Sequence, residues 1–434
     1  MQGILKDELQ NYRNDYESKD YKGSQAALAR TEMKDVVYLP NMGAKLARDF
    51  SIEVKTRGIT AQQKSGRCWM YSLLNILREQ VAVDCNLKEF KLSSNYIIFY
   101  DKLEKANNFM EMIIKHADKP LNDHWNEYIL NGPKDGGYFD MARDLVLKYG
   151  VVPEYVMPDN YQSSHTESFL KIYTRILHKA ASELRKAVEE GSDVQEKKRE
   201  WMSKIYRFEC ICLGTPPEAF DFVYRNEKGE YHEEVNMSPK GFYSKYCDIQ
   251  LEDYVTLTNQ ITDNKPLHSH FIFHYLGSMA DSNIDCVNVT IEELETACIS
   301  QLKGGNPVWF GCDAGAYGDR LEGIWDPDSF AYESIFDMNW DIEKSERLKY
   351  KDSFATHAMI LTGVNLDGEG TPNRWKVENS WGKDVGRDGY FVLSEKYFKD
   401  YVYEAVIHKK YLTKEQIEIY SSKPIEILPW ESDC

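Results

Sequence analysis

Three side chains far apart in the sequence could together carry out nucleophilic acyl transfer. Cys68 opens the run Cys-Trp-Met-Tyr-Ser-Leu-Leu-Asn, which favours a helix and is apolar on nearly all sides. A thiol reacts as its thiolate, and a helix N-terminus lowers the pKa of a thiol placed there. Cys68 is therefore the candidate nucleophile, and Arg67 would favour its thiolate further if the guanidinium points that way.

The candidate base and its partner lie in the last third of the chain. His357 begins the run His-Ala-Met-Ile-Leu-Thr-Gly-Val, so its imidazole can project from the end of a buried strand. Asn379 follows in Glu-Asn-Ser-Trp-Gly, where its carbonyl could accept the imidazole N–H while Trp381 shields that bond from water. The two predict a Cys-His-Asn constellation, in which Asn379 orients the base.

A carboxamide six residues before the nucleophile could stabilise the developing oxyanion. Gln62 has this offset, and its N–H could act together with the backbone N–H of Cys68. Gln63 is a rival because it is adjacent, but the six-residue offset favours Gln62. This chemistry requires no metal and no organic cofactor.

The elements that must position these residues divide the chain unevenly. Apolar residues recur at helical spacing from about 166 to 188, Gly-Ser-Asp at 191–193 interrupts them, and a second charged helical stretch ends at Trp201-Met202. Residues 36–40 read as an extended arm. Short β-type runs cover 307–310, 358–361, 374–377 and 390–393. We expect five parts: a wrapping segment 1–60, a helical lobe 61–160, a mainly helical insertion 161–300, a β lobe 301–420 and a C-terminal arm 421–434.

Composition excludes several classes of protein. The 434 residues carry a net charge of −17, which argues against nucleic acid as a partner. The first twenty residues lack the apolar core of a secretory signal, and the mean hydropathy of −0.57 argues against a membrane span. Nine cysteines without a dense, even framework fit reduced thiols in a cytoplasm. We expect Cys210 and Cys212 to be buried, inert thiols.

These motifs resemble those of the papain superfamily, and specifically of the bleomycin hydrolase or aminopeptidase C family. The run Ser-Gly-Arg-Cys-Trp at 65–69 narrows the resemblance from the superfamily to this one family. His357 follows Cys68 by about 290 residues, whereas simple papain-like enzymes have about 130–150. The excess matches the helical insertions of this branch. The resemblance implies an α+β, papain-like two-lobe fold, with a central Cys helix, a β-barrel-like lobe, helical insertions and a C-terminal arm.

The resemblance extends to residues around the substrate and to assembly. Asp135-Gly136-Gly137 is similar to the glycine pair that binds the substrate backbone beside the second subsite, although an ordinary turn is an alternative reading. The family implies a homohexamer whose active sites face an inner cavity and admit peptides. The C-terminal arm lies in each cleft, and its terminal carboxylate receives the substrate's α-amino group. The implied activity is that of a cytoplasmic aminopeptidase.

The tail departs from that pattern. Only Glu431, Ser432, Asp433 and Cys434 follow Trp430, about three residues fewer than usual, which retracts the carboxylate by about 10 Å. Either Asp433 and the chain end at Cys434 still bind an amine, or the cleft is open and the protein is a thiol endopeptidase using the same residues. A non-catalytic scaffold or nucleic-acid-binding homologue is the rival from another class, and the intact constellation argues against it.

Overall fold

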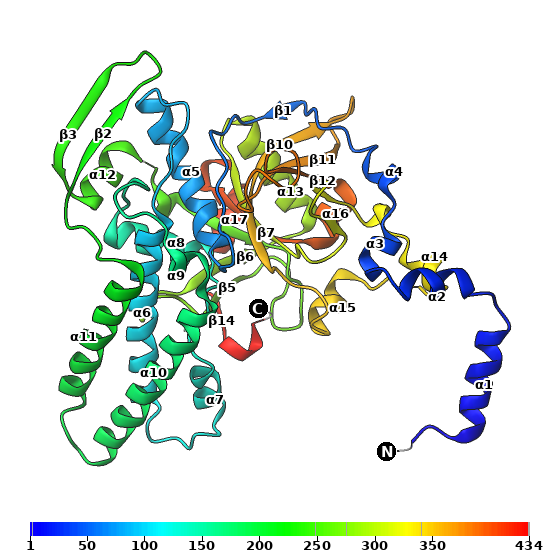
Figure 1. Cartoon of the computed structure of the whole chain (residues 1–434), viewed down its shortest axis with the longest axis horizontal. Coiled ribbons are helices and arrows are strands. Elements are labelled where there is room, and N and C mark those ends of the chain that lie inside the picture. Colours follow the sequence, from blue (N-terminus) through cyan, green and yellow to red (C-terminus); the bar gives the residue numbers. More distant parts are fainter. Residues whose placement is uncertain (2, 248, 275, 340, 433–434) are drawn as a thin grey trace.

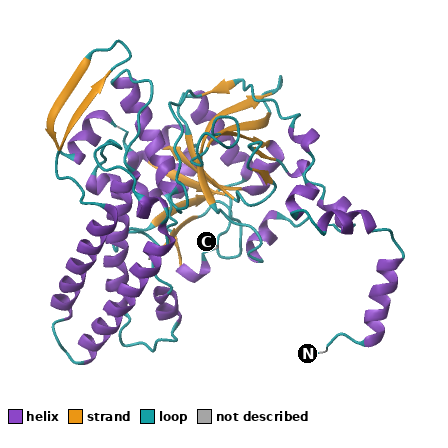
Figure 2. Cartoon of the chain, in the orientation of Figure 1, coloured by secondary structure: helices purple, strands orange, loops and turns teal. Residues whose placement is uncertain are grey.

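The long helices lie on one side of the molecule together with one β-hairpin, and the large sheet lies on the other side with several shorter helices (Figures 1 and 2). The computed structural model describes residues 1, 3–247, 249–274, 276–339 and 341–432. Two clusters of buried apolar side chains lie in it, one mainly among helices and one mainly behind the sheet. None of the described helices is long and apolar enough to cross a membrane. The protein therefore has the two lobes expected of the predicted fold class.

The helical lobe is built around α5 (Cys68–Asp84). Every residue from Trp69 to Arg78 is buried, which agrees with a central helix that is apolar on nearly all sides. It packs against α8 (Phe139–Tyr149), α6 (Ser94–Lys115) and, from the other lobe, a strand of the sheet. The remaining helices of this half are α7 (His124–Leu130), α9 (Tyr161–Ser164) and α12 (Pro239–Tyr246).

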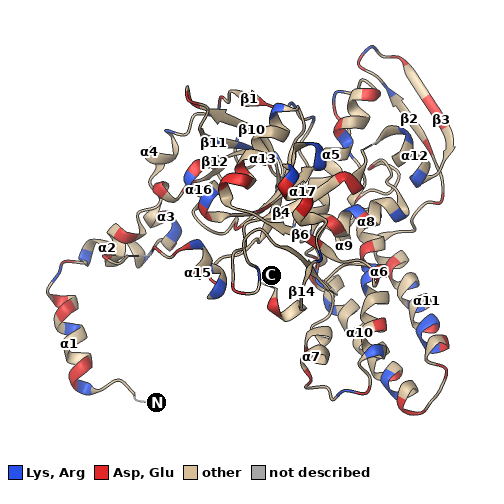
Figure 3. Ribbon diagram, turned by 180° about the vertical axis from the view of Figure 1, so that it is seen from behind, with Lys and Arg blue, Asp and Glu red and all other residues tan. Residues whose placement is uncertain are grey.

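The predicted helical pair consists of α10 (Thr166–Glu189) and α11 (Val194–Leu213), with Asp193 capping α11. The predicted end of the second helix at Met202 is wrong. Ile205, Glu209 and Leu213 continue the buried face at helical spacing beyond Trp201, and the helix ends only at Gly214. Basic and acidic side chains alternate along its outer face (Figure 3). Cys210 and Cys212 are free but only half-buried, because they lie beside this buried face rather than on it.

Among the described residues, twelve strands form one mixed sheet, in the order β14-β5-β6-β4-β13-β7-β10-β11-β12-β9-β8, with β1 on β10. All four predicted β runs are strands: β7 (Val308–Cys312), β10 (His357–Leu366), β11 (Pro372–Glu378) and β12 (Tyr390–Ser394). They are antiparallel neighbours in that order. The others are β1 (Ile52–Glu53), β8 (Gly318–Asp319), β9 (Ile324–Trp325), β13 (Val402–His408) and β14 (Ile425–Ile427).

The segment 161–300 is less helical than expected. After α11 it forms a hairpin of β2 (Phe220–Arg225) and β3 (Tyr231–Met237), and then β4 (Tyr254–Thr258), β5 (His270–Phe273) and β6 (Ile284–Asn288). The last three join the main sheet, where β4 pairs with β13. That pairing joins segments about 150 residues apart, so local patterns did not reveal it. Helices α13 (Ile291–Lys303), α14 (Tyr332–Phe336), α15 (Lys344–Lys349), α16 (Glu395–Tyr401) and α17 (Lys414–Tyr420) complete this half.

The N-terminal segment is mostly helical. It forms α1 (Lys6–Glu17), α2 (Lys22–Leu28), α3 (Met33–Val37) and α4 (Pro40–Gly43). The extended arm predicted for residues 36–40 is wrong, because the turn of α3 buries Val37. Tyr38 then bridges to Phe330. Helix α1 projects away from the rest of the chain (Figure 1), and no residue within it is buried.

Buried polar contacts hold the two lobes together directly behind the predicted nucleophile. Arg78 of α5 donates to Glu378 of β11 at 2.6 Å, and both side chains are almost fully buried. The indole N–H of Trp309 in β7 donates to the backbone oxygen of Trp69 at 3.0 Å. Because these bonds link the helix of Cys68 to the strands of the base, they fix the relative placement of the two lobes.

Candidate active site

Cys68 is the first residue of α5 and lines a cavity of about 540 Å³ together with His357. The chain reaches the helix through a tight turn at Gly66, whose backbone N–H donates to Asp135 at 3.2 Å. A Cβ on Gly66 would lie 2.7 Å from the Cβ of Asp135, so only glycine fits there. The turn therefore positions the thiol at a helix N-terminus, as the sequence predicts.

His357 and Asn379 meet across two antiparallel strands. His357 is the first residue of β10 and Asn379 follows β11, so the strand pairing brings them side by side. His357 Nε2 lies 2.8 Å from Asn379 Oδ1, which means that the imidazole N–H donates to the amide oxygen. Trp381 stacks on the imidazole with ring centroids 4.8 Å apart. The arrangement leaves Nδ1 as the ring nitrogen that can exchange a proton with the thiol.

Burial disfavours charge on both reacting groups when each is considered alone. It raises the pKa of Cys68, an effect opposed by backbone N–H groups of Ala358 and Trp69. It lowers the pKa of His357 to about 4, against the effect of the Asn379 hydrogen bond and with a smaller contribution from the charge of Arg320. A proton transferred from Cys68 to His357 would leave opposite charges at the same cavity wall, where each charge would stabilise the other.

The lowered pKa of His357 predicts a specific acid sensitivity of the fold. An unfolded histidine titrates near 6.5, so between about pH 6.5 and 4 the unfolded chain binds the extra proton and folding stability falls on acidification. Between pH 7 and pH 4, the unfolding free energy of the wild type should fall by about 3 kcal/mol more than that of His357→Gln. Urea unfolding at a series of pH values measures this difference. Parallel curves for the two proteins would contradict it.

Gln62 is held in the orientation that an oxyanion donor needs. Its Nε2 donates to the backbone oxygen of Ser65 at 2.6 Å, and the Ser380 hydroxyl donates to its Oε1 at 2.7 Å. These two contacts fix which end of the amide is nitrogen and leave one of its two N–H groups for a substrate. Gln62 is buried beside the nucleophile's turn, whereas Gln63 is exposed. The geometry favours Gln62 over Gln63.

Arg67 has a structural role instead of the expected electrostatic one. Its guanidinium is fully buried and donates to Asp159 at 2.7 Å, to Ser94 at 2.8 Å and to the hydroxyl of Ser65 at 2.9 Å. Asp159 therefore compensates its charge, and these contacts fasten the turn before Cys68 to the neighbouring helix α6.

Gly136 and Gly137 both line the cavity, but for different reasons. A Cβ on Gly137 would lie 2.6 Å from the ring of Trp69, so packing requires glycine. Gly136 has open space at that position, and its carbonyl accepts a hydrogen bond from Lys105 at 3.0 Å. Sequence patterns did not reveal Lys105, which lies inside α6. A lysine within a helix is ordinary, and only the tertiary structure places it beneath the loop.

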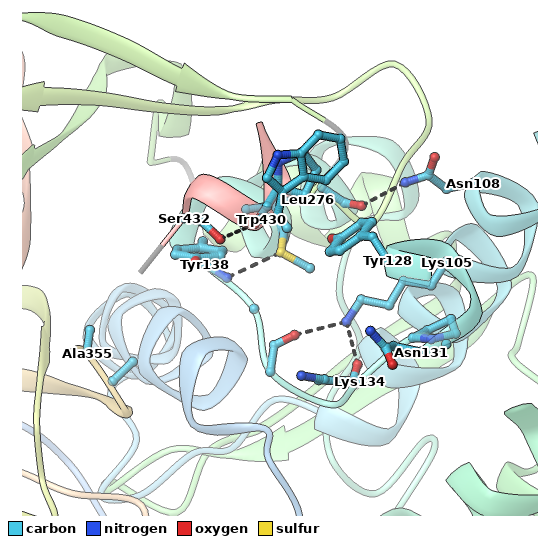
Figure 4. A pocket seen from close by; sticks show the side chains of 18 of the residues that line it. Lys105, Asn108, Tyr128, Asn131, Lys134, Tyr138, Leu276, Ala355, Trp430 and Ser432 are labelled. Carbon is cyan, nitrogen blue, oxygen red and sulfur yellow. Dashed lines mark hydrogen bonds between the residues drawn. The ribbon is translucent and has the colours of Figure 1, made fainter. Parts of the chain in front are cut away.

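The C-terminal arm lies in the same cavity. Pro429, Trp430 and Ser432 line it together with Cys68 and His357. Figure 4 shows Trp430 across the cavity from Lys105 and Lys134. The Trp430 ring packs edge-on against Trp125, with centroids 4.7 Å apart. Asp433 and Cys434, which we predicted to bind substrate, lie outside the described residues.

The fold and site together define a papain-like cysteine peptidase, in which a helix-borne thiol faces a His–Asn pair on a sheet. The chain matches the model of the Peptidase C1-like family over residues 3–433, and it belongs to that family. The family and fold predicted from the motifs are thus confirmed, while the bleomycin hydrolase branch stays a prediction.

Similar proteins cover nearly the whole chain. It is 40% identical over 431 residues to "Aminopeptidase C" of Listeria innocua, covering 99% of this chain and 98% of the relative. It is 41% identical over 415 residues to "Aminopeptidase G" of Lactobacillus delbrueckii subsp. lactis, covering 94% and 93%. The crystal structure of PepW from Lactobacillus rhamnosis superposes with a TM-score of 0.96 at 36% identity, covering 99% and 98%.

Proposed function

We propose that this protein is a cysteine aminopeptidase that releases N-terminal residues from peptides. The observation that carries the proposal is that the C-terminal arm, through Pro429, Trp430 and Ser432, lines the cavity of Cys68 and His357. An arm in this place shortens the cleft on one side, so a substrate must begin near the nucleophile. The relatives named aminopeptidases support the same reading.

In the proposed reaction, the Cys68 thiol transfers its proton to His357 and attacks the scissile carbonyl. Gln62 and the backbone N–H of Cys68 stabilise the oxyanion. His357 then protonates the leaving amine, and a water deprotonated by the same imidazole releases the acyl group. Asn379 keeps the ring oriented throughout.

A thiol endopeptidase using the same residues is the second candidate. It is the alternative that the motifs leave open, because Cys68, His357, Asn379 and Gln62 would serve it equally well. In that case, bound peptides extend past the arm residues that line the cavity. The two candidates use the same chemistry and differ only in whether a free α-amine is required.

Hydrolysis of leucine arylamide and of its N-acetylated counterpart separates the two candidates. An aminopeptidase should cleave the free amine at least about 100-fold faster, because the blocked substrate loses a charged contact and meets the arm. Equal rates would identify an endopeptidase. Cleavage of neither substrate, or cleavage that persists in Cys68→Ala, would contradict the peptidase proposal itself.

For assembly and location, we propose a homohexamer in the cytoplasm. Helix α1 supports assembly, since it carries exposed apolar residues at helical spacing and projects from the body (Figure 1). These residues are Leu9, Tyr12 and Tyr16, together with Leu5 directly before the helix. An apolar stripe of this kind is typical of a surface that a second copy covers. Free cysteines throughout the described residues agree with a reducing compartment.

A further inference from the structure

A buried carboxyl group that the catalytic chemistry does not use lies in the wall of the active-site cavity. Glu404 is the third residue of β13, is only 5% exposed, and lines the same cavity as Cys68 and His357. It stands opposite Gly311 of β7 in the sheet. A Cβ on Gly311 would lie 2.4 Å from Glu404 Oε1, so the glycine provides the space that this carboxyl occupies.

Unlike several other buried acids, Glu404 has no hydrogen-bond or ion-pair partner among the described residues. Glu378 is paired with Arg78, Asp159 with Arg67, and Asp135 with Lys102. Burial, with the charge of Asp140 as a smaller cause, raises the pKa of Glu404 to about 8. A carboxyl group with this pKa is mostly protonated at neutral pH, and its ionised form needs a counter-charge beside it.

The positive charges of the cavity do not meet this need. Lys105 lies 3.1 Å from Asp101 and donates to two backbone oxygens, of Lys134 and Gly136. Lys134 and Lys351 are exposed at the cavity's rim. A cation that pairs with ionised Glu404 would therefore come from a bound molecule.

The sheet register places Glu404 within reach of a substrate held at Cys68. Glu404 is opposite Gly311, and Gly311 is opposite Ala358, whose backbone N–H lies at the Cys68 thiol. Neighbouring strands are about 4.8 Å apart, so the backbone of Glu404 is about 10 Å from that of Ala358. The charge of Glu404 contributes to raising the pKa of Cys68. An extended peptide rises about 3.3–3.6 Å per residue, which brings the first two residues on the acyl side into range.

We propose that Glu404 is a specificity-determining residue that binds a cationic nitrogen of the substrate on the acyl side of the scissile bond. The nitrogen is either the free α-ammonium group or the side chain of a Lys or Arg at one of the first two residues. The inference rests on the proposed peptidase function. It adds Glu404 as a residue that selects substrates carrying a positive charge. A cation next to Glu404 forms a hydrogen-bonded ion pair with the carboxylate, which no neutral substrate can make.

Matched substrates and variants test this proposal. The substrates are aminoacyl and dipeptidyl arylamides whose acyl part carries Arg, its neutral isostere citrulline, Leu, or Leu without its α-amine. The enzymes are the wild type, Glu404→Gln and a control, Glu295→Gln. Burial also raises the pKa of Glu295 to about 8, but Glu295 lies on α13 and does not line the cavity. The measured quantity is kcat/KM for each pair.

We expect Glu404→Gln to lower kcat/KM on cationic substrates by at least about 10-fold. Its kcat/KM on the neutral analogues, and all values for Glu295→Gln, should stay unchanged. A loss on Arg relative to citrulline identifies the side chain as the ligand, and a loss on Leu relative to its desamino analogue identifies the α-ammonium group. An equal change on all substrates, or no change, would overturn the proposal. If the proposed peptidase function itself is wrong, the result differs, because the wild-type protein then cleaves none of the arylamide substrates.

Discussion

Replacing Cys68 by alanine should lower kcat on leucine arylamide by about 10⁵–10⁶-fold, because the variant has no atom that can form the acyl intermediate. His357→Ala should cost about as much, since without the base the thiol keeps its proton. The Cys68→Ala/His357→Ala double variant should be no slower than either single one. This non-additivity is the sign of two residues that act as one unit. Steady-state and single-turnover rates on purified protein measure all three.

The fold must survive these changes for the comparison to be valid. Cys68 is half-buried, and its removal leaves the buried contacts of Arg78 and Trp309 that join the lobes intact. Far-UV circular dichroism and the urea midpoint of Cys68→Ala should therefore match the wild type. A folded Cys68→Ala protein that retains more than about 1% of the activity would show that another group is the nucleophile.

Gln62→Ala should reduce kcat by about 10²–10³-fold with a much smaller change in KM. The reason is that its amide donates to an oxygen whose negative charge exists in the transition state and not in the bound substrate. Ser65 and Ser380 hold the amide before substrate arrives, so the full effect of the donor is available without rearrangement.

The neighbouring Gln63 provides the matched control. It is exposed and has a positive φ of 55°, a conformation that asparagine tolerates. Gln63→Asn should leave kcat and KM within about twofold of the wild type. If Gln63→Asn instead produced the large loss and Gln62→Ala did not, the oxyanion donor would have been assigned to the wrong residue.

Local sequence patterns predicted those helices and strands whose burial is evident from their own residues. Helix α5 and strands β7, β10 and β12 were found because each buries its own apolar run, and β11 because buried Trp375 and Val377 alternate with polar residues. Strands β4 to β6 were missed, because their place in the sheet depends on pairing with β13 far along the chain. The short helix at Val37 was also missed, since its one buried side chain depends on the body of the protein.

The sequence by itself predicted the candidate reactive groups of this protein. Residue types and short-range order were enough to predict this chemistry. The signals were the spacing of Gln62 and Cys68, the strand start at His357 and the Asn-Ser-Trp-Gly run at Asn379. Only the tertiary structure decided which charges are satisfied. It paired Arg67 with Asp159 instead of directing its charge at the thiol, and it left Glu404 buried in the cavity without a described partner. The physical reason is that burial and ion pairing depend on segments brought together by folding, and no local pattern encodes them.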